Sequence, residues 1–211
     1  MTELKTKEDL LNKLRAYAFT SDDDVIKYKN IVKNKLLDCP ELLYSLNDEE
    51  FISELFDDNG NMVVDEDGNL IGDVDKYFGE NSLIRPVITF PGTQTEVKNF
   101  LCYQVGFVNT PRYGKGIQKY TQIIFTIFVN NQNLVDALTG IPRHDLIGSI
   151  LRERFNWSNI FGMQTHLISN KESTTDNDYV VRTLVFQITD LNSMVTTANG
   201  KSNINNYQLR R

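Results

Sequence analysis

A metal-dependent nuclease is the sharpest catalytic interpretation of the residue spacing. Glu96 and Lys98 are two residues apart, and Asp75 lies upstream of them. On a strand, residues two apart point to the same face, where two acids hold Mg²⁺ and a lysine orients the attacking water. Such a short pattern also arises from ordinary surface ion pairs, which favours a solvated face. The nuclease, with Asp75, Glu96 and Lys98, is therefore the alternative function.

Other residue types that carry chemistry are few and badly spaced. His144 and His166 have no serine or cysteine in a recognisable nucleophile setting, so ordinary structural roles are favoured. The acidic stretch 57–82 fails the calcium-loop pattern, which needs glycine at position 6 and glutamate at position 12. The glycines around Lys115 lack the spacing of a phosphate-binding loop. We predict that the protein is not an enzyme and uses no cofactor and no metal.

Composition places the chain among globular proteins. It has 211 residues, and 40% of them are hydrophobic, which suits one large domain or a domain with a smaller appendage. No apolar run approaches the roughly 20 residues that span a bilayer, and no apolar stretch follows the charged N-terminus. Cys39 and Cys102 lie far apart in unrelated contexts, which predicts no disulfide framework. We expect a soluble, unexported protein in a reducing compartment, without a membrane partner.

The net charge of −6 hides an asymmetry along the chain. Residues 1–80 contain 9 Lys and Arg against 20 Asp and Glu, whereas residues 81–211 contain 13 against 8. No basic cluster is dense enough for a duplex-binding stripe, but opposite fields steer subunits together. Arg182 alternates with apolar residues, so its guanidinium needs a carboxylate from the same or a neighbouring subunit. The interface candidates are Arg112, Lys115, Lys119, Arg143, Arg152, Arg154 and Arg182.

Spacing and turn residues predict an α+β fold in four parts. They are an N-terminal helical region, an acidic loop or hairpin, an α+β core domain and a flexible polar tail, at residues 1–56, 57–82, 83–191 and 192–211. In the first part, Thr6, Ser21 and Asn47 each precede a carboxylate by three residues, a pattern typical of helix starts. Pro40 ends the second helix. The tip of the acidic hairpin is Asp67-Gly68.

The core domain begins with a predicted long hairpin. Apolar residues alternate over 100–109 and again over 120–130, and the connecting loop contains Arg112, Lys115 and Lys119. An antiparallel sheet with this long hairpin follows from the pattern. The basic loop is a natural contact element in an assembly.

A helix and two more strands complete the core domain. Residues 143–155 follow Pro142 and have apolar side chains at helical spacing, with Arg143 outside the buried stripe. Strands are predicted at 163–169 and 179–189, with a polar turn between them. The last strand is apolar on both faces, which predicts a central strand or one that packs against a neighbouring subunit.

Three segments of this core resemble a known class of proteins. GIPRHDLI at 140–147, FNW at 155–157 and DYVVRTLVF at 178–186 resemble small structural proteins at the head–tail junction of tailed bacteriophages. Those neck, connector and tail-terminator proteins share an antiparallel sheet, a long hairpin and a flanking helix. The resemblance implies a virion protein, assembled in the host cytoplasm, that forms a homo-oligomeric ring for the passage of double-stranded DNA. Its partners would be portal, connector or tail-tube proteins.

Overall fold

The computed structural model has an α+β fold, as predicted. It describes residues 6–17, 24–47, 49–68, 70, 73–79, 82–88, 97–108, 112–113, 116–175 and 178–191. The helices are α1 (Lys7–Tyr17), α2 (Asp24–Leu37), α3 (Pro40–Ser45), α4 (Glu49–Leu55), η1 (Val74–Tyr77), η2 (Asn131–Asn133) and α5 (Arg143–Phe155). The strands are β1 (Ile84–Arg85), β2 (Phe100–Val108), β3 (Arg112–Tyr113), β4 (Gly116–Asn130), β5 (Thr165–Thr174) and β6 (Tyr179–Leu191).

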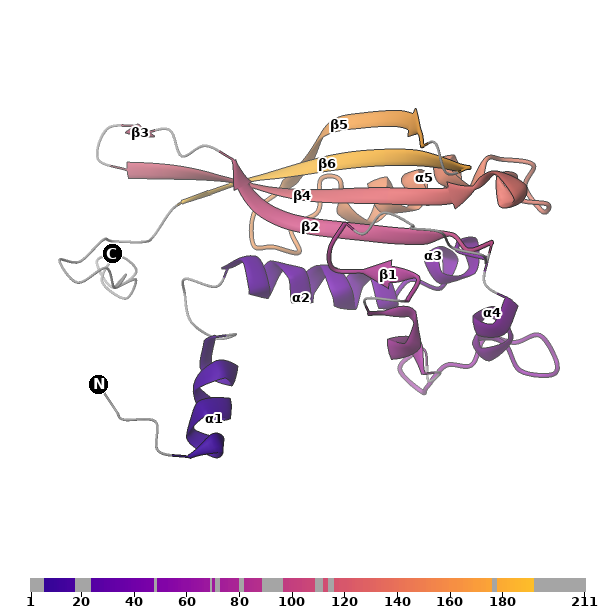
Figure 1. Ribbon diagram of the computed structural model, residues 1–211, viewed down its shortest axis with the longest axis horizontal. Coiled ribbons are helices and arrows are strands. Elements are labelled where there is room, and N and C mark those ends of the chain that lie inside the picture. The colour runs from indigo at the N-terminus through magenta and orange to yellow at the C-terminus, as the bar shows by residue number, and fades with distance from the viewer. Residues whose placement is uncertain are drawn as a thin grey trace.

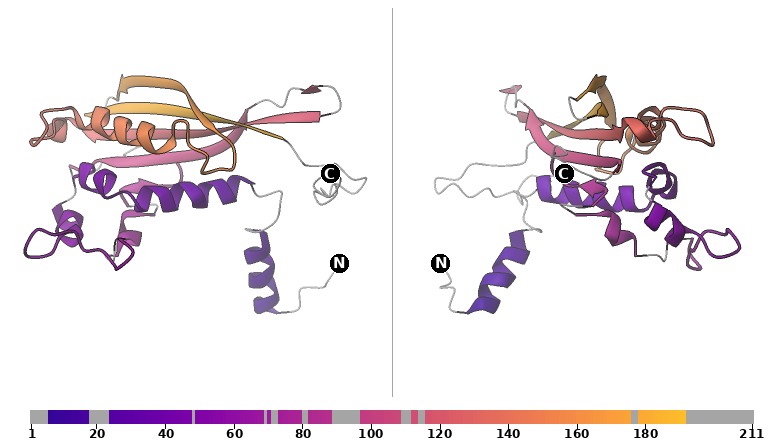
Figure 2. Two further views of the ribbon diagram at one scale, coloured as in Figure 1. Left: turned by 180° about the vertical axis from the view of Figure 1, so that it is seen from behind. Right: turned by 45° about the vertical axis from the view of Figure 1, so that its right-hand side comes forward.

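The strands form one sheet in the order β1-β2-β4-β6-β5, and β3 pairs with β4. All neighbours are antiparallel except β1 and β2, which run parallel. Figure 1 shows α2 and α3 beneath the sheet, and the reverse view in Figure 2 shows α5 beside them. The long hairpin of β2 and β4 is confirmed. The prediction that the last strand is central is also confirmed, because β6 lies between β4 and β5.

The main core lies between the sheet and the helices α2, α3 and α5. It contains Leu36 and Leu42 from the helices and Phe125, Phe186 and Leu151 from the sheet and α5, all fully buried. Burying these large apolar side chains on one face of the sheet supplies most of the drive for folding. A second, smaller cluster lies on the other face, and its residues are Phe100, Cys102, Phe128, Tyr179 and Val181. Both faces of β6 are therefore apolar, as its sequence pattern predicts.

Several elements differ from the predictions. Strand β4 begins at Gly116, so Lys119 lies in a strand and not in the predicted hairpin loop. Pro40 does follow the end of α2, but it also begins α3, because proline is tolerated in the first turn where its missing N–H has no partner. Strand β5 continues to Thr174 through residues predicted to be a turn. It is an edge strand, so polar side chains remain solvated there, and Glu172 is paired in register with Arg182 across the sheet.

The cap at Thr6 and the turn of the acidic hairpin are confirmed. Thr6 and Asp9 exchange hydrogen bonds between their side chains and backbone N–H groups, both at 3.1 Å. The acidic hairpin turns at Asp65–Gly68, where the N–H of Gly68 donates to the carbonyl of Asp65 and the φ of Gly68 is +83°. Only glycine adopts that φ without strain. The polar tail, residues 192–211, lies outside the described residues.

Candidate functional site

Helix α5 brings together most of the predicted interface residues, and the first of them is buried. The Arg143 and Asp136 side chains are only 5% and 7% exposed, and Arg143 Nη1 lies 3.1 Å from Asp136 Oδ1. The prediction that Arg143 lies outside the buried stripe is wrong, because the loop before α5 folds back and supplies this carboxylate. Hydrogen bonds from Thr139 and the charge of Arg143 hold the pKa of Asp136 below its ordinary value of 3.8.

A second charged group links α5 to strands β5 and β6. The Arg182 side chain is 19% exposed, contacts Asp145 and donates from Nε to Asn170 Oδ1 at 2.9 Å. The predicted carboxylate partner therefore comes from the same chain. Arg182 also lies against Gly148, where an added Cβ would be 3.1 Å from Arg182 Cδ. Glycine at that point of α5 lets the arginine lie between helix and sheet.

His144 belongs to the same group. It is buried, and its Nε2 lies 3.2 Å from Glu172 Oε2 and 3.8 Å from Asp145 Oδ2. These donor atoms lie within 4.8 Å of one another, which is the kind of set that can hold a metal ion. The Arg182 guanidinium contacts Asp145, and His144 lies between Asp145 and Glu172. The arrangement ties the edge strand β5 to the start of α5.

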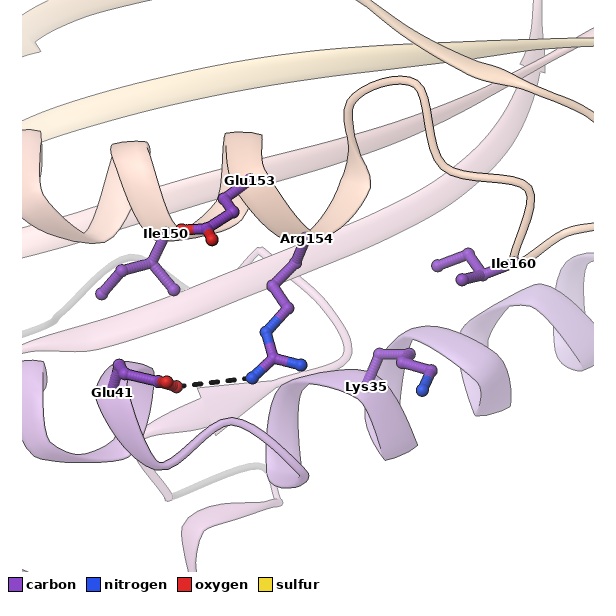
Figure 3. A pocket seen from close by; sticks show the side chains of 6 residues that line it. All are labelled: Lys35, Glu41, Ile150, Glu153, Arg154 and Ile160. Carbon is purple, nitrogen blue, oxygen red and sulfur yellow. Dashed lines mark hydrogen bonds and ion pairs between the residues drawn. The ribbon is translucent and has the colours of Figure 1, made fainter.

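A pocket of about 410 Å³ lies where the C-terminal half of α5 faces α2 and α3. Figure 3 shows its charged side chains, with Arg154 Nη2 3.4 Å from Glu41 Oε2. Lys35 and Glu153 also line it. The buried Cys39 thiol donates to Glu41, and burial raises the pKa of that thiol to about 11. The Cys39 thiol therefore stays protonated at neutral pH.

The chain leaves α5 through a strained, exposed tryptophan. Trp157 has a φ of +62°, which costs a bulky residue roughly 1 kcal/mol relative to glycine at this position. Its N–H donates to the carbonyl of Thr165 at 2.7 Å. Its ring packs edge-on against the His166 ring, with the two centroids 4.6 Å apart, and the free energy of this contact is similar in size to the backbone strain. Trp157 is nevertheless 63% exposed. It borders a hollow of about 460 Å³, also lined by Ser149, Arg152, Glu153 and Asn156.

The basic hairpin loop occupies the opposite end of the sheet. Arg112 lies in β3, which pairs with β4 through Arg112 and Ile117. Lys119 lies in β4, opposite Asp190 of β6. Lys115 is outside the described residues. Figure 1 shows β4 projecting beyond the helices toward this loop. Arg112 and Lys119 share one arm of the molecule, separate from the arginines of α5.

The residues of the alternative nuclease do not form a described site. Asp75 lies in η1, and its carboxylate contacts Lys33 Nζ at 2.8 Å. Lys98 is exposed just before β2, and Glu96 lies outside the described residues. The Asp75 carboxylate therefore forms an ion pair with Lys33 of α2. Such a surface ion pair is what the solvated-face interpretation expects.

Two features of this region escape sequence reasoning. The burial of Asp136 depends on Arg143 and on the fold of the loop, and the only local signal is the Asp136-Thr139 spacing of a turn. The exposure of Trp157 has no sequence signal, because tryptophan after an amphipathic helix is normally expected in the core.

Comparison with protein families decides the class of this molecule. The YomW family model matches residues 39–188, from the start of α3 to near the end of β6. The chain belongs to the YomW family. YomW itself is a protein from the SPBc2 phage region of Bacillus, so this is a phage-associated family. No curated protein matches the chain. The matched segment contains α5, its loops and all of the sheet except the last three residues of β6.

Proposed function

We propose that this protein is a structural virion protein that forms a homo-oligomeric ring at the head–tail junction of a tailed phage. In this role it is a neck, connector or tail-terminator subunit and catalyses no reaction. DNA passes through the ring without sequence-specific binding. The neighbours are portal, connector or tail-tube proteins of the same virion. Membership of a phage-associated family and the resemblance of the α5 and β6 segments support this role.

The projecting arm is the observation that carries the proposal. Strand β4 has 15 residues, and its pairing with β2 ends where Tyr120 is opposite Val108. Residues 116–119 of β4 extend beyond this pairing. Figure 1 shows this part of the sheet reaching beyond α2, away from the main core. A strand edge at the end of a sheet offers backbone groups that can pair with an adjacent subunit.

The charge distribution fits such an assembly. The arm carries Arg112, Lys115 and Lys119 without an acidic residue between them, whereas the hairpin at 57–68 carries five acidic residues and no basic one. Opposite charges on separate parts of one subunit favour association between copies. None of the described helices is long and apolar enough to cross a membrane.

The proposal is tested by the mass and image of the purified full chain. We expect rings in negative-stain images and a mass that is a multiple of the 24.3 kDa subunit. The double variant Arg112→Glu with Lys119→Glu should assemble less well, because it reverses the charge of the arm. Lys171→Glu, on the exposed edge strand β5, is the matched control and should assemble normally. A monomer in isolation and with purified virion components would contradict the proposal.

The alternative is tested in the same preparation. Magnesium-dependent cleavage of plasmid DNA that is lost in Glu96→Ala would establish a nuclease and remove the structural role. We expect no cleavage, since Asp75 is paired with Lys33.

A further inference from the structure

Three metal-ligating side chains from two elements converge at the N-terminal end of α5. His144 and Asp145 are consecutive in the first turn of α5, and Glu172 comes from β5. His144 Nε2 lies 3.2 Å from Glu172 Oε2 and 3.8 Å from Asp145 Oδ2. One ligand atom from each residue lies within 4.8 Å of the other two. The group contains an imidazole nitrogen as well as two carboxylates, which separates it from an ordinary surface cluster of acids.

His144 is the buried member of this group, and its ring has few polar contacts. Its side chain is 6% exposed, and its Nδ1 has no hydrogen-bond partner in the part of the chain that the structure describes. Its Nε2 contacts Glu172, whose side chain is 56% exposed. A buried polar ring that is satisfied so poorly by its own chain is explained by a bound water or ion. A bond from Nε2 to a cation that both carboxylates hold would offset the cost of burying the ring.

The sheet and α5 together determine where the carboxylates lie. Glu172 is in register with Arg182 across β5 and β6, and the Arg182 guanidinium contacts Asp145 Oδ1. Arg182 Nε also donates to Asn170 Oδ1 at 2.9 Å, which fixes the arginine. The other Asp145 oxygen, Oδ2, is the one nearer to His144. Carboxylates that bind metals are commonly held by an outer hydrogen-bond partner, so Arg182 is a positioning residue for Asp145.

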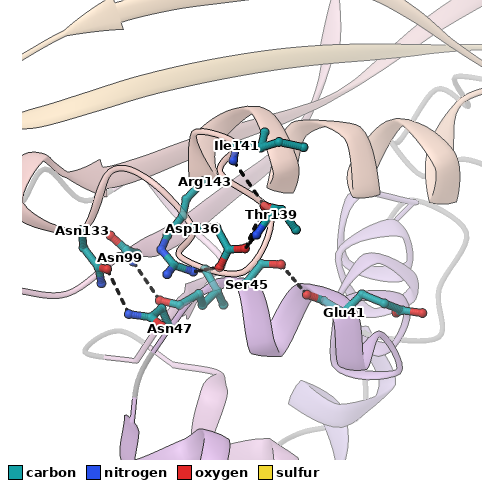
Figure 4. Close-up of polar contacts among 10 residues, drawn as sticks. Glu41, Ser45, Asn47, Asn99, Asn133, Asp136, Thr139, Ile141 and Arg143 are labelled. Carbon is teal, nitrogen blue, oxygen red and sulfur yellow. Dashed lines mark hydrogen bonds and ion pairs between the residues drawn. The ribbon is translucent and has the colours of Figure 1, made fainter.

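The start of α5 is held from its other side by the loop at 131–142. We call this segment the apolar loop, because its one charged residue, Asp136, is buried. Arg143 Nη1 lies 3.1 Å from Asp136 Oδ1, and Thr139 donates to Asp136 Oδ2 from its N–H and its hydroxyl at 2.9 and 2.8 Å (Figure 4). Ligands on a helix start that is already ordered lose little conformational entropy on binding.

We propose that His144, Asp145 and Glu172 bind a divalent transition-metal ion of the Zn²⁺ class. An imidazole nitrogen with two carboxylates suits Zn²⁺, whereas Ca²⁺ takes roughly six to eight oxygen ligands. The two carboxylates carry one more negative charge than Arg182 offsets, so the group attracts a cation.

The distances fit such an ion. Bonds of about 2.0–2.2 Å place two ligand atoms of a tetrahedral Zn²⁺ site about 3.3 Å apart. The distance of 3.2 Å from His144 Nε2 to Glu172 Oε2 matches this value. The Asp145 and Glu172 side chains are 40% and 56% exposed, so both have room to close the remaining gap. Water would supply the fourth ligand.

The ion would have a structural role, because it joins the edge strand β5 to α5. An ion that binds the folded chain alone raises its stability by mass action. The site differs from the sequence-based expectation of no metal. Its ligands escape a motif search because His144 and Glu172 are 28 positions apart and come together only through the register of β5 and β6.

Zn²⁺ binding to the purified full chain tests the proposal. The chain is stripped with EDTA, dialysed and titrated with ZnCl₂ by calorimetry, and its unfolding temperature is measured with and without the ion. We expect binding of one ion per chain, and at about 100 times the Kd a rise of roughly 5–10 °C in unfolding temperature. Glu172→Gln removes one ligand at a position that is more than half exposed, so the ion-free variant should unfold near the wild-type temperature. It should bind Zn²⁺ at least about tenfold more weakly.

His166→Asn is the matched control, because it removes the other histidine of the chain and leaves the three ligands in place. It should bind Zn²⁺ as the wild type does. A wild type that binds no Zn²⁺ would overturn the site, and so would equal binding by the wild type and Glu172→Gln. Loss of binding in His166→Asn would also overturn it, because the ion would then lie elsewhere. None of these results bears on the proposed ring, which needs no ion.

Discussion

Two loops of similar length differ in which side chains they bury and which they expose. The hairpin at 57–68 exposes its acidic residues, and Asp57 Oδ1 accepts hydrogen bonds from the N–H groups of Asn59 and Asn61. The apolar loop at 131–142 buries its one acid and exposes Leu138. The first loop is satisfied by its own residues and water. The second depends on a contact between its Asp136 and Arg143 of α5.

The largest expected effect is on the buried pair beneath the apolar loop. Asp136→Asn leaves the Arg143 charge buried without a counter-ion, which should lower the free energy of unfolding by roughly 3 kcal/mol. Thermal unfolding of Asp136→Asn measures this loss. Asp57→Asn, in the other loop, is the control and should unfold close to the wild-type temperature. Equal effects at the two positions would show that the loops do not differ as described.

The buried pair of Asp136 and Arg143 predicts that the stability of the fold depends on pH. The pKa of Asp136 is lower in the folded chain than its ordinary value of 3.8, mainly because Thr139 donates to the ionised form. The resulting stability is fully present above pH 3.8 and is lost as the pH falls through the lower, folded pKa. Asp136→Asn should therefore show a smaller loss of stability than the wild type on acidification. Parallel curves for the two proteins would contradict this contribution.

The next variant should change assembly and leave the free energy of unfolding unchanged. Leu138→Asp changes a fully solvated position, so its unfolding free energy should stay within about 0.5 kcal/mol of the wild type. Its assembly should weaken, because a contact between copies over this loop would bury an unpaired charge. The mass of the particle in solution measures this. Val64→Asp, at an exposed apolar position of the acidic hairpin, is the matched control and should assemble normally.

Trp157→Gly tests the exposed tryptophan after the C-terminal end of α5. Glycine relieves the left-handed backbone but removes the contact with His166, so the two effects nearly cancel and stability should change by less than about 1 kcal/mol. Assembly should weaken strongly. A large fall in the unfolding temperature would show instead that Trp157 stabilises its own subunit.

The smallest effect is expected in the acidic hairpin. Asp57 is exposed, and its pKa is lowered mainly by the backbone N–H of Asn61, so Asp57→Ala removes only a local turn contact. We expect a slight fall in the unfolding temperature and unchanged assembly. A loss of assembly would place this hairpin in the contact between copies.

The sequence predicts the regular parts of the fold because their signals are local. Helix α5 has the predicted bounds, since Pro142 marks its start and apolar residues recur at helical spacing. The hairpin of β2 and β4 follows from alternation over nine or more residues. Helix α3 is missed because it has six residues and no side-chain cap. The polar half of β5 is missed because an edge strand needs no apolar pattern there.

The candidate site is less predictable because its residues depend on contacts distant in sequence. The requirement of Arg182 for a carboxylate is evident from its strand position, but the identity of Asp145 is not. The paired Arg143 and the exposed Trp157 follow from how loops fold against the sheet. The interface roles of Arg112, Lys119 and Arg152 stay predictions.

The most direct test of the central claim is the mass of the purified full chain, measured together with the double variant Arg112→Glu with Lys119→Glu. Self-assembly through the arm predicts a closed oligomer visible as a ring for the wild type and weaker assembly for the double variant. A wild type that remains a monomer, alone and with virion components, would contradict the claim.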